Sequence, residues 1–182
     1  MMQEQSLPPA VVAAVIGSAA TIALALLTWV GRAIAQVLAE RRELNELLRA
    51  FHAEVTDKLE ISEIAFKNYN VEQICEKMRK DKTYTPFITL ERYSSPVFES
   101  FMKDLPKFPA SVIKPVIDFY RWDRVTHAAF ETLMTDKVKD LEVDRRIQLF
   151  TDAATLWEKH LEKGRAARKA IENQVDALDH PT

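Results

Sequence analysis

The chain has 182 residues, and its 25 basic and 27 acidic residues leave a formal net charge of −2. This balance argues against a general nucleic-acid binder, which carries a basic surface, and against an acidic disordered tail. Three glycines are too few for hairpin-rich β folds or glycine-rich phosphate loops, and the single cysteine, Cys75, excludes an intrachain disulfide.

Residues 10 to 30 form one apolar run without a charged residue. As a helix this run is about 31 Å long, which matches a hydrocarbon core of about 30 Å. Pro8 and Pro9 precede it, and Trp29 stands near its end, where an aromatic ring anchors in the headgroup layer. We therefore expect a transmembrane helix over 10–30 after a short extracytoplasmic tail, 1–9.

Two alternatives compete with this span. A cleaved signal peptide has a basic start and an apolar core of about 7 to 15 residues, whereas residues 1–9 contain Glu4 and no Lys or Arg. The other alternative is a helix buried in a soluble fold.

The basic residues that follow the span are Arg32, Arg41, Arg42 and Arg49. The positive-inside rule then predicts a single-pass protein of the cell membrane, with the N-terminus outside and the large domain cytoplasmic.

Small residues recur in the expected span at Ala13, Gly17 and Thr21. A small residue at every fourth position lets two spans pack closely, so this face is a candidate for dimerisation. The alternative is that small residues are simply common in membrane spans.

The segment 31–80 is expected to form a long helix, over about 33–66, and a second short one. The first has apolar residues spaced mostly by three and four, at Val37, Leu44, Leu48, Phe51, Val55 and Leu59. Asn68 to Asn70 predict the break, because Asn favours turns. A short helix follows over Val71–Lys80, with Ile74, Cys75 and Met78 on one side.

Residues 81–115 hold five of the eight prolines and several large apolar residues, which predicts a folded connector. Ser95 and Pro96 predict the start of a helix over 96–105. Phe98, Phe101 and Met102 would line one face of it. The best strand candidate is Phe87–Leu90.

The C-terminal part, 110–180, is expected to form a helical hairpin. The first helix, over 110–139, would bury Ile113, Ile117, Tyr120, Val125, Phe130, Leu133 and Met134. The last helix keeps alternating steps of three and four over more than four heptads, at Ile147, Phe150, Ala154, Trp157, Leu161, Gly164, Arg168, Ile171, Val175 and Leu178. We call these ten residues the heptad seam. The predicted fold is all-α: a transmembrane helix continuing into an antiparallel bundle of three to four helices with a proline-rich corner.

This layout resembles small single-span bacterial membrane proteins of uncharacterised function. The resemblance rests on the span, its basic flank and the stretch Val97-Phe98-Glu99-Ser100 through Leu105-Pro106 to Asp118-Phe119-Tyr120. It covers most of the chain and implies no activity.

No motif for catalysis, metal or cofactor binding is present. The histidines, His52, His127, His160 and His180, are widely separated. Cys75 is interpreted as a small core residue. A basic run on the last helix, from Lys159 to Lys169, is interleaved with glutamates and is interpreted as a solvated face. We therefore expect no enzyme and no cofactor, although a membrane-tethered enzyme remains an alternative.

An aromatic and basic cluster stands out at Tyr120, Arg121, Trp122 and Arg124. Tyr, Trp and Arg dominate binding hot spots, so the cluster is a candidate partner surface. The alternative is that Tyr120 packs inward and the arginines pair with Asp118 and Asp123.

The expected function is a membrane-anchored, non-enzymatic assembly module at the cytoplasmic face. It would contact itself or another membrane or cytoplasmic protein through the heptad seam, because ten seam positions exceed what one small bundle requires. The alternative is a membrane effector whose spans oligomerise and perturb the bilayer.

Overall fold

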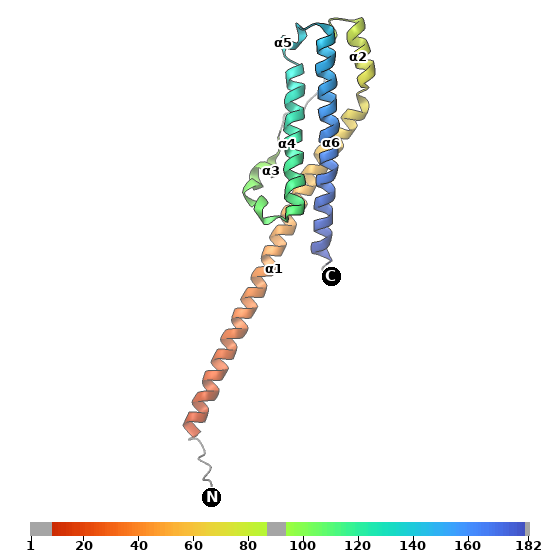
Figure 1. Ribbon diagram of the computed structural model, residues 1–182. Helices are drawn as coiled ribbons and strands as arrows, with labels where there is room; N and C mark the ends of the chain where they lie inside the picture. Colours follow the sequence, from red (N-terminus) through yellow and green to blue (C-terminus); the bar gives the residue numbers. More distant parts are fainter. Residues whose placement is uncertain (1–8, 87–93, 181–182) are drawn as a thin grey trace. The chain divides into compact units, whose positions relative to one another are not determined.

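The computed structural model describes residues 9–86 and 94–180, and in the first helix it describes the side chains of Thr21 and of Leu24 onward (Figure 1). All the regular secondary structure in these residues is helical, which confirms the all-α prediction. The helices are α1 Pro9–Asn68, α2 Val71–Lys80, α3 Pro96–Phe101, the 3-10 helix η1 Met102–Lys107, α4 Ala110–Leu133, α5 Asp136–Lys139 and α6 Val143–Asp179. The strand candidate Phe87–Leu90 lies outside the described residues.

The chain divides into two compact units, residues 1–43 and residues 44–182, which we call the N-terminal unit and the bundle unit. In the N-terminal unit, every side chain described from Leu24 to Glu40 is exposed, including Val37. Across the described residues, no helix has a stretch both long and apolar enough to pass through a membrane. The side chains of Ala13 and Gly17 lie outside the described set, and Thr21 is exposed.

The break between α1 and α2 falls where the asparagines predict it. α1 ends at Asn68, and the Asn70 side chain accepts a hydrogen bond of 3.0 Å from the Gln73 amide at the start of α2. This side chain satisfies one of the amides that a helix start leaves without a partner. The apolar side of α2 is buried as expected, at Ile74, Cys75 and Met78.

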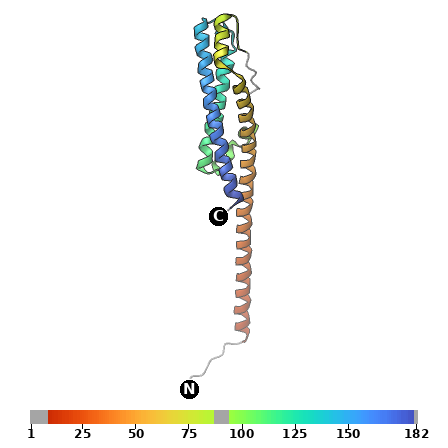
Figure 2. The ribbon, with the colours of Figure 1, turned by 90° about the vertical axis from the view of Figure 1, so that its right-hand side faces the viewer.

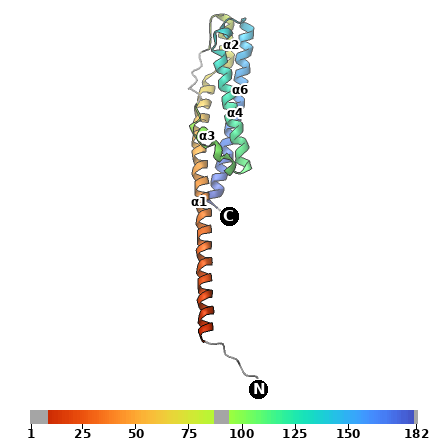
Figure 3. The same cartoon turned by 90° about the vertical axis from the view of Figure 1, so that its left-hand side faces the viewer.

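In the bundle unit, α6 runs antiparallel to α1 and α4, whereas α1 and α4 run parallel. The α1–α6 order follows from two contacts: Arg49 binds Asp179 at 2.7 Å, and the later Ser62 accepts a hydrogen bond from the earlier Trp157 at 2.6 Å. Figures 2 and 3 show α6 beside α1 and beside α4. The antiparallel prediction therefore holds for α6 alone, because α3 begins beside Glu54 of α1 and α4 then runs along α1 in the same direction.

Two adjoining apolar clusters form the core of the bundle unit. The first is built from α1, η1, α4 and α6, at Leu47, Leu48, Phe51, Val55, Leu105, Phe108, Val112, Val116, Phe119, Tyr120, Ala167 and Ile171. The second adds α2 and α5, at Leu59, Ile74, Cys75, Met78, Phe130, Leu133, Val138, Phe150, Ala153, Trp157 and Leu161. Phe51 contacts the rings of Phe98, Phe108 and Tyr120 edge-on, and this aromatic packing adds to the area buried.

The helix expected over 96–105 is shorter, because α3 ends at Phe101 and η1 follows. Pro106 has no amide hydrogen, and its ring would clash with the carbonyl four residues earlier in an α-helix. The chain tightens into a 3-10 helix instead, and this leaves Phe101 and Met102 exposed while Phe98 packs against the core.

The single helix expected over 110–139 is two helices, α4 and α5. The Thr135 hydroxyl donates to the Thr132 carbonyl at 2.8 Å, and Thr135 itself is extended, which ends α4. The predicted buried face is also shifted, because Ile117 and Val125 are exposed while Val116 and Phe119 are buried. Aromatic Phe119 buries more area than Ile117 and takes the position between α1 and α6.

Candidate functional site

The four residues of the aromatic and basic cluster on α4 do not form one exposed surface. Tyr120 is buried, Trp122 is half-buried, and Arg121 and Arg124 are exposed. The Tyr120 hydroxyl donates to the Glu54 carboxylate at 2.7 Å, so Tyr120 belongs to the core and not to a partner surface. On this stretch the two arginines are exposed and Trp122 is partly exposed.

The heptad seam is used within the chain. Phe150, Ala154, Trp157, Leu161, Gly164 and Ile171 are buried in the chain's own bundle, and Ile147, Val175 and Leu178 pack against its edge. The parallel α1 and α4 both lie against α6, so the long seam serves two neighbours along its length. The residues expected to contact another chain therefore face the chain's own core.

Glu54 is a residue that the sequence did not single out. One carboxylate oxygen accepts the Tyr120 hydrogen bond, and the other accepts the Val97 amide in the first turn of α3. Ser95 stands at the predicted start of α3, but its hydroxyl makes no capping bond. Glu54 therefore caps α3 from a distance and joins α1, α3 and α4.

A second polar cluster joins α1, α4 and α6. Lys58 donates to Asp123 Oδ2 at 2.9 Å, and His160 Nε2 lies 3.9 Å from Asp123 Oδ1. His160 is 3% exposed, its ring stacks on Phe119, and its Nδ1 has no hydrogen-bond partner among the described residues. Burial lowers the pKa of His160 below its ordinary value, Asp123 opposes this effect and Lys58 adds to it. We interpret the cluster as a structural ion pair beside a neutral histidine.

This cluster predicts acid destabilisation of the bundle. Because the folded pKa of His160 is below its unfolded value, about 6.5, full stability is present above that pH and is lost as the pH falls. One proton changes stability by at most about 1.4 kcal/mol per pH unit. Chemical unfolding of the full chain in mild detergent should give a lower unfolding free energy at pH 5.5 than at pH 7.5.

The matched variant is His160→Gln, which cannot take up a proton in this range. Its unfolding free energy should change less between the same two pH values than that of the wild type. An equal change in both proteins would assign the acid sensitivity to other groups.

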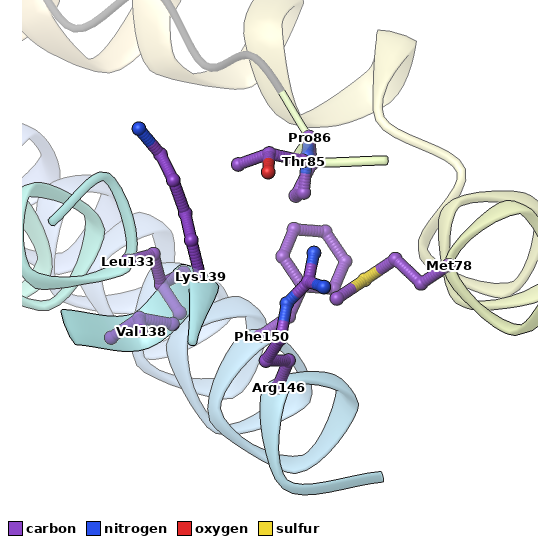
Figure 4. Close-up of a pocket in the computed structure, with 8 residues that line it drawn as sticks. All are labelled: Met78, Thr85, Pro86, Leu133, Val138, Lys139, Arg146 and Phe150. Carbon is purple, nitrogen blue, oxygen red and sulfur yellow. The ribbon is translucent and has the colours of Figure 1, made fainter. Parts of the chain in front are cut away.

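Five segments meet at a shallow cleft near the start of α6 (Figure 4). The cleft, with its opening included, has a volume of about 250 Å³. The cleft is lined by Met78, Thr85, Pro86, Leu133, Val138, Lys139, Arg146 and Phe150. Arg146 is buried, and its guanidinium donates to the carbonyls of Lys82 and Tyr84. Lys139 donates to Asp136 at 2.8 Å. Both cations are thus engaged by the chain itself, and Arg146 holds the connector onto α6.

The basic run on α6 also pairs with acidic residues of the same chain. Lys159 and Lys163 both donate to Glu162, and these hydrogen bonds lower the pKa of Glu162 to about 2. Arg165 donates to Glu63 of α1 at 2.7 Å. This pairing agrees with a solvated helix face for the basic run.

The histidines do not form a metal centre in the described chain. His52 pairs with Glu172 at 3.1 Å and His127 with Glu131 at 3.4 Å. Within residues 9–86 and 94–180, no three His, Cys, Asp or Glu side chains gather closely enough to hold a metal ion.

The feature of the described chain with the clearest functional meaning is the exposed apolar part of α1. Leu24, Leu26, Leu27, Trp29 and Val30 are between 44% and 70% exposed. Further along α1, Ile34, Val37 and Leu38 are exposed as well. Apolar side chains concentrated in this way mark a surface that another molecule or a membrane covers.

Comparison of the chain with protein-family models, with curated proteins and with solved structures finds no match.

Proposed function

We propose that this chain is a membrane-anchored, non-enzymatic helical module. The run 10–30 holds it in the cell membrane as a single pass with the N-terminus outside. The bundle unit then lies in the cytoplasm and assembles there, with further copies of itself or with another membrane or cytoplasmic protein.

The observation that carries the proposal is the distribution of apolar side chains around α1 between Leu24 and Val30. At 100° per residue, Leu24, Leu26, Leu27, Trp29 and Val30 point to most sides of the helix, and all of them are exposed. A helix that is apolar all round is stable inside a protein core or inside a bilayer. The uncharged run from residue 10 to residue 30 has the length for a bilayer.

The bundle unit supports the non-enzymatic part of the proposal. Three of its partly or fully buried charged groups join segments of the chain: Glu54 caps α3, Asp123 binds Lys58, and Arg146 binds the connector. Such contacts explain these residues without a substrate. The bundle also has its own core, so it can act as a folded body beside the membrane.

Membrane retention tests the proposal. The double variant Leu24→Arg with Leu27→Arg should lose membrane association, because it leaves an uncharged run of only 14 residues, 10–23, which is too short to cross a bilayer. In cell fractions washed at alkaline pH, the wild type should stay with the membranes and the variant should move to the supernatant.

The matched control is Ile61→Arg with Ile64→Arg, which changes two exposed apolar residues of the bundle unit. This control should stay with the membranes as the wild type does. A wild-type protein that washes off, or a Leu24→Arg, Leu27→Arg variant that stays bound, would overturn the membrane anchor.

A further inference from the structure

The side chains of α1 segregate to two sides directly after the proposed span. Ile34, Val37 and Leu38 are 55%, 62% and 59% exposed. Their spacing of three and four places them on one face of the helix. Gln36 and Glu40 lie on the opposite face, where Gln36 donates to Glu40 at 2.9 Å. The segment is therefore amphipathic, and its apolar face has no cover within the described N-terminal unit.

The same apolar face continues back along α1. Leu27 and Val30 precede Ile34 by seven and four positions, so steps of three and four connect Leu27, Val30, Ile34 and Val37, with Leu38 beside them. We call these five residues the juxtamembrane stripe. Gly31 lies next to it, and a Cβ added there would meet nothing within 4 Å. The backbone is thus open to the close approach of another helix at this point.

Lipid does not explain the one-sided part of the stripe. A helix segment inside a bilayer is apolar on all sides, as α1 is from Leu24 to Val30, whereas Gln36 and Glu40 are polar. Lying flat on the membrane surface does not explain it either. α1 is continuous from Pro9 through the end of the N-terminal unit, so the segment leaves the membrane along the axis of the proposed span.

We propose that a second copy of this chain covers the juxtamembrane stripe, in a parallel and in-register pair of α1 helices. This inference rests on the proposed membrane anchor, because the anchor inserts every copy with the same direction and depth. Residue Ile34 of each copy then lies at the same height, and a stripe with coiled-coil spacing is complementary to itself in that arrangement.

Disulfide cross-linking in native membranes tests the pairing with the full chain. Cys75→Ala first removes the natural cysteine. Single cysteines are then placed on the stripe, as Ile34→Cys or Val37→Cys, and on the opposite face, as Gln36→Cys or Ala39→Cys. A disulfide needs Cβ atoms about 3.5–4.5 Å apart, so only facing positions react well. After mild oxidation, the two stripe variants should give several-fold more covalent dimer than the two opposite-face variants.

Two further readouts identify the occupant and separate the two proposals. Coexpressed tagged and untagged chains should give a band of intermediate size, which shows that both halves are this chain. Alkaline washing of the same membranes reports the anchor independently. Retained protein with equal cross-linking on both faces, with none, or with a band of another mass overturns the pairing and leaves the anchor intact. Released protein that still cross-links only through the stripe overturns the anchor and supports the pairing.

Discussion

Replacing Phe51 with alanine should destabilise the bundle unit by about 3–5 kcal/mol, the range for a large aromatic removed from a core. Phe51 is fully buried, and its ring meets Phe98, Phe108 and Tyr120 at centroid distances of 6.5, 5.3 and 6.4 Å. The loss would leave a cavity where α1, α3, η1 and α4 meet. Chemical unfolding of the full chain in mild detergent, followed by circular dichroism, measures the change.

Phe101→Ala is the control for this experiment, because Phe101 is 39% exposed at the end of α3. It should cost about 1 kcal/mol or less. Equal losses in the two variants would show that the aromatic cluster around Phe51 does not hold the bundle together.

Gly164→Leu should destabilise the bundle by about 3 kcal/mol, through overpacking and not through a cavity. A Cβ at residue 164 would lie 2.8 Å from Leu59 Cδ1 and 3.2 Å from Phe119 Cε2. Both neighbours are fully buried, so neither ring nor methyl group has room to move away. Thermal and chemical unfolding midpoints of the full chain should both fall.

Ala166→Leu adds a side chain of the same kind two residues away on the exposed side of α6. Its stability should stay within about 0.5 kcal/mol of the wild type. If Gly164→Leu is equally harmless, then α6 does not pack closely against α1 and α4 at Gly164.

Local sequence pattern predicted the positions of α1, α2, α4 and α6 and the break between α1 and α2, but not η1 or the division between α4 and α5. These features depend on residues that are near each other in the chain, such as Asn70 and Gln73. The same patterns predicted less well which residues are buried, because burial depends on where the neighbouring helices lie. The choice of Val116 and Phe119 over Ile117 depends on where α1 and α6 lie, and periodicity within α4 does not contain that information.

The polar groups of the bundle could not be predicted because their partners are distant in sequence. Lys58 and Asp123 are 65 positions apart, and Glu54 and Tyr120 are 66 apart. The heptad seam showed a related limit, since spacing predicts that residues such as Trp157 and Leu161 are covered but not whether the cover is the same chain. The juxtamembrane stripe has the same spacing, and there the structure shows its side chains exposed.

The distance along the chain between α1 and α6 also sets an order of events during synthesis. The contact between His52 and Glu172 joins residues 120 positions apart, and a ribosome needs roughly 6 to 24 s to make that length at 5–20 residues per second. During this interval Leu48 and Phe51 have no α6 to cover them. We expect the proposed span to enter the bilayer before the bundle closes, so a nascent chain would present this apolar face to chaperones at the membrane surface.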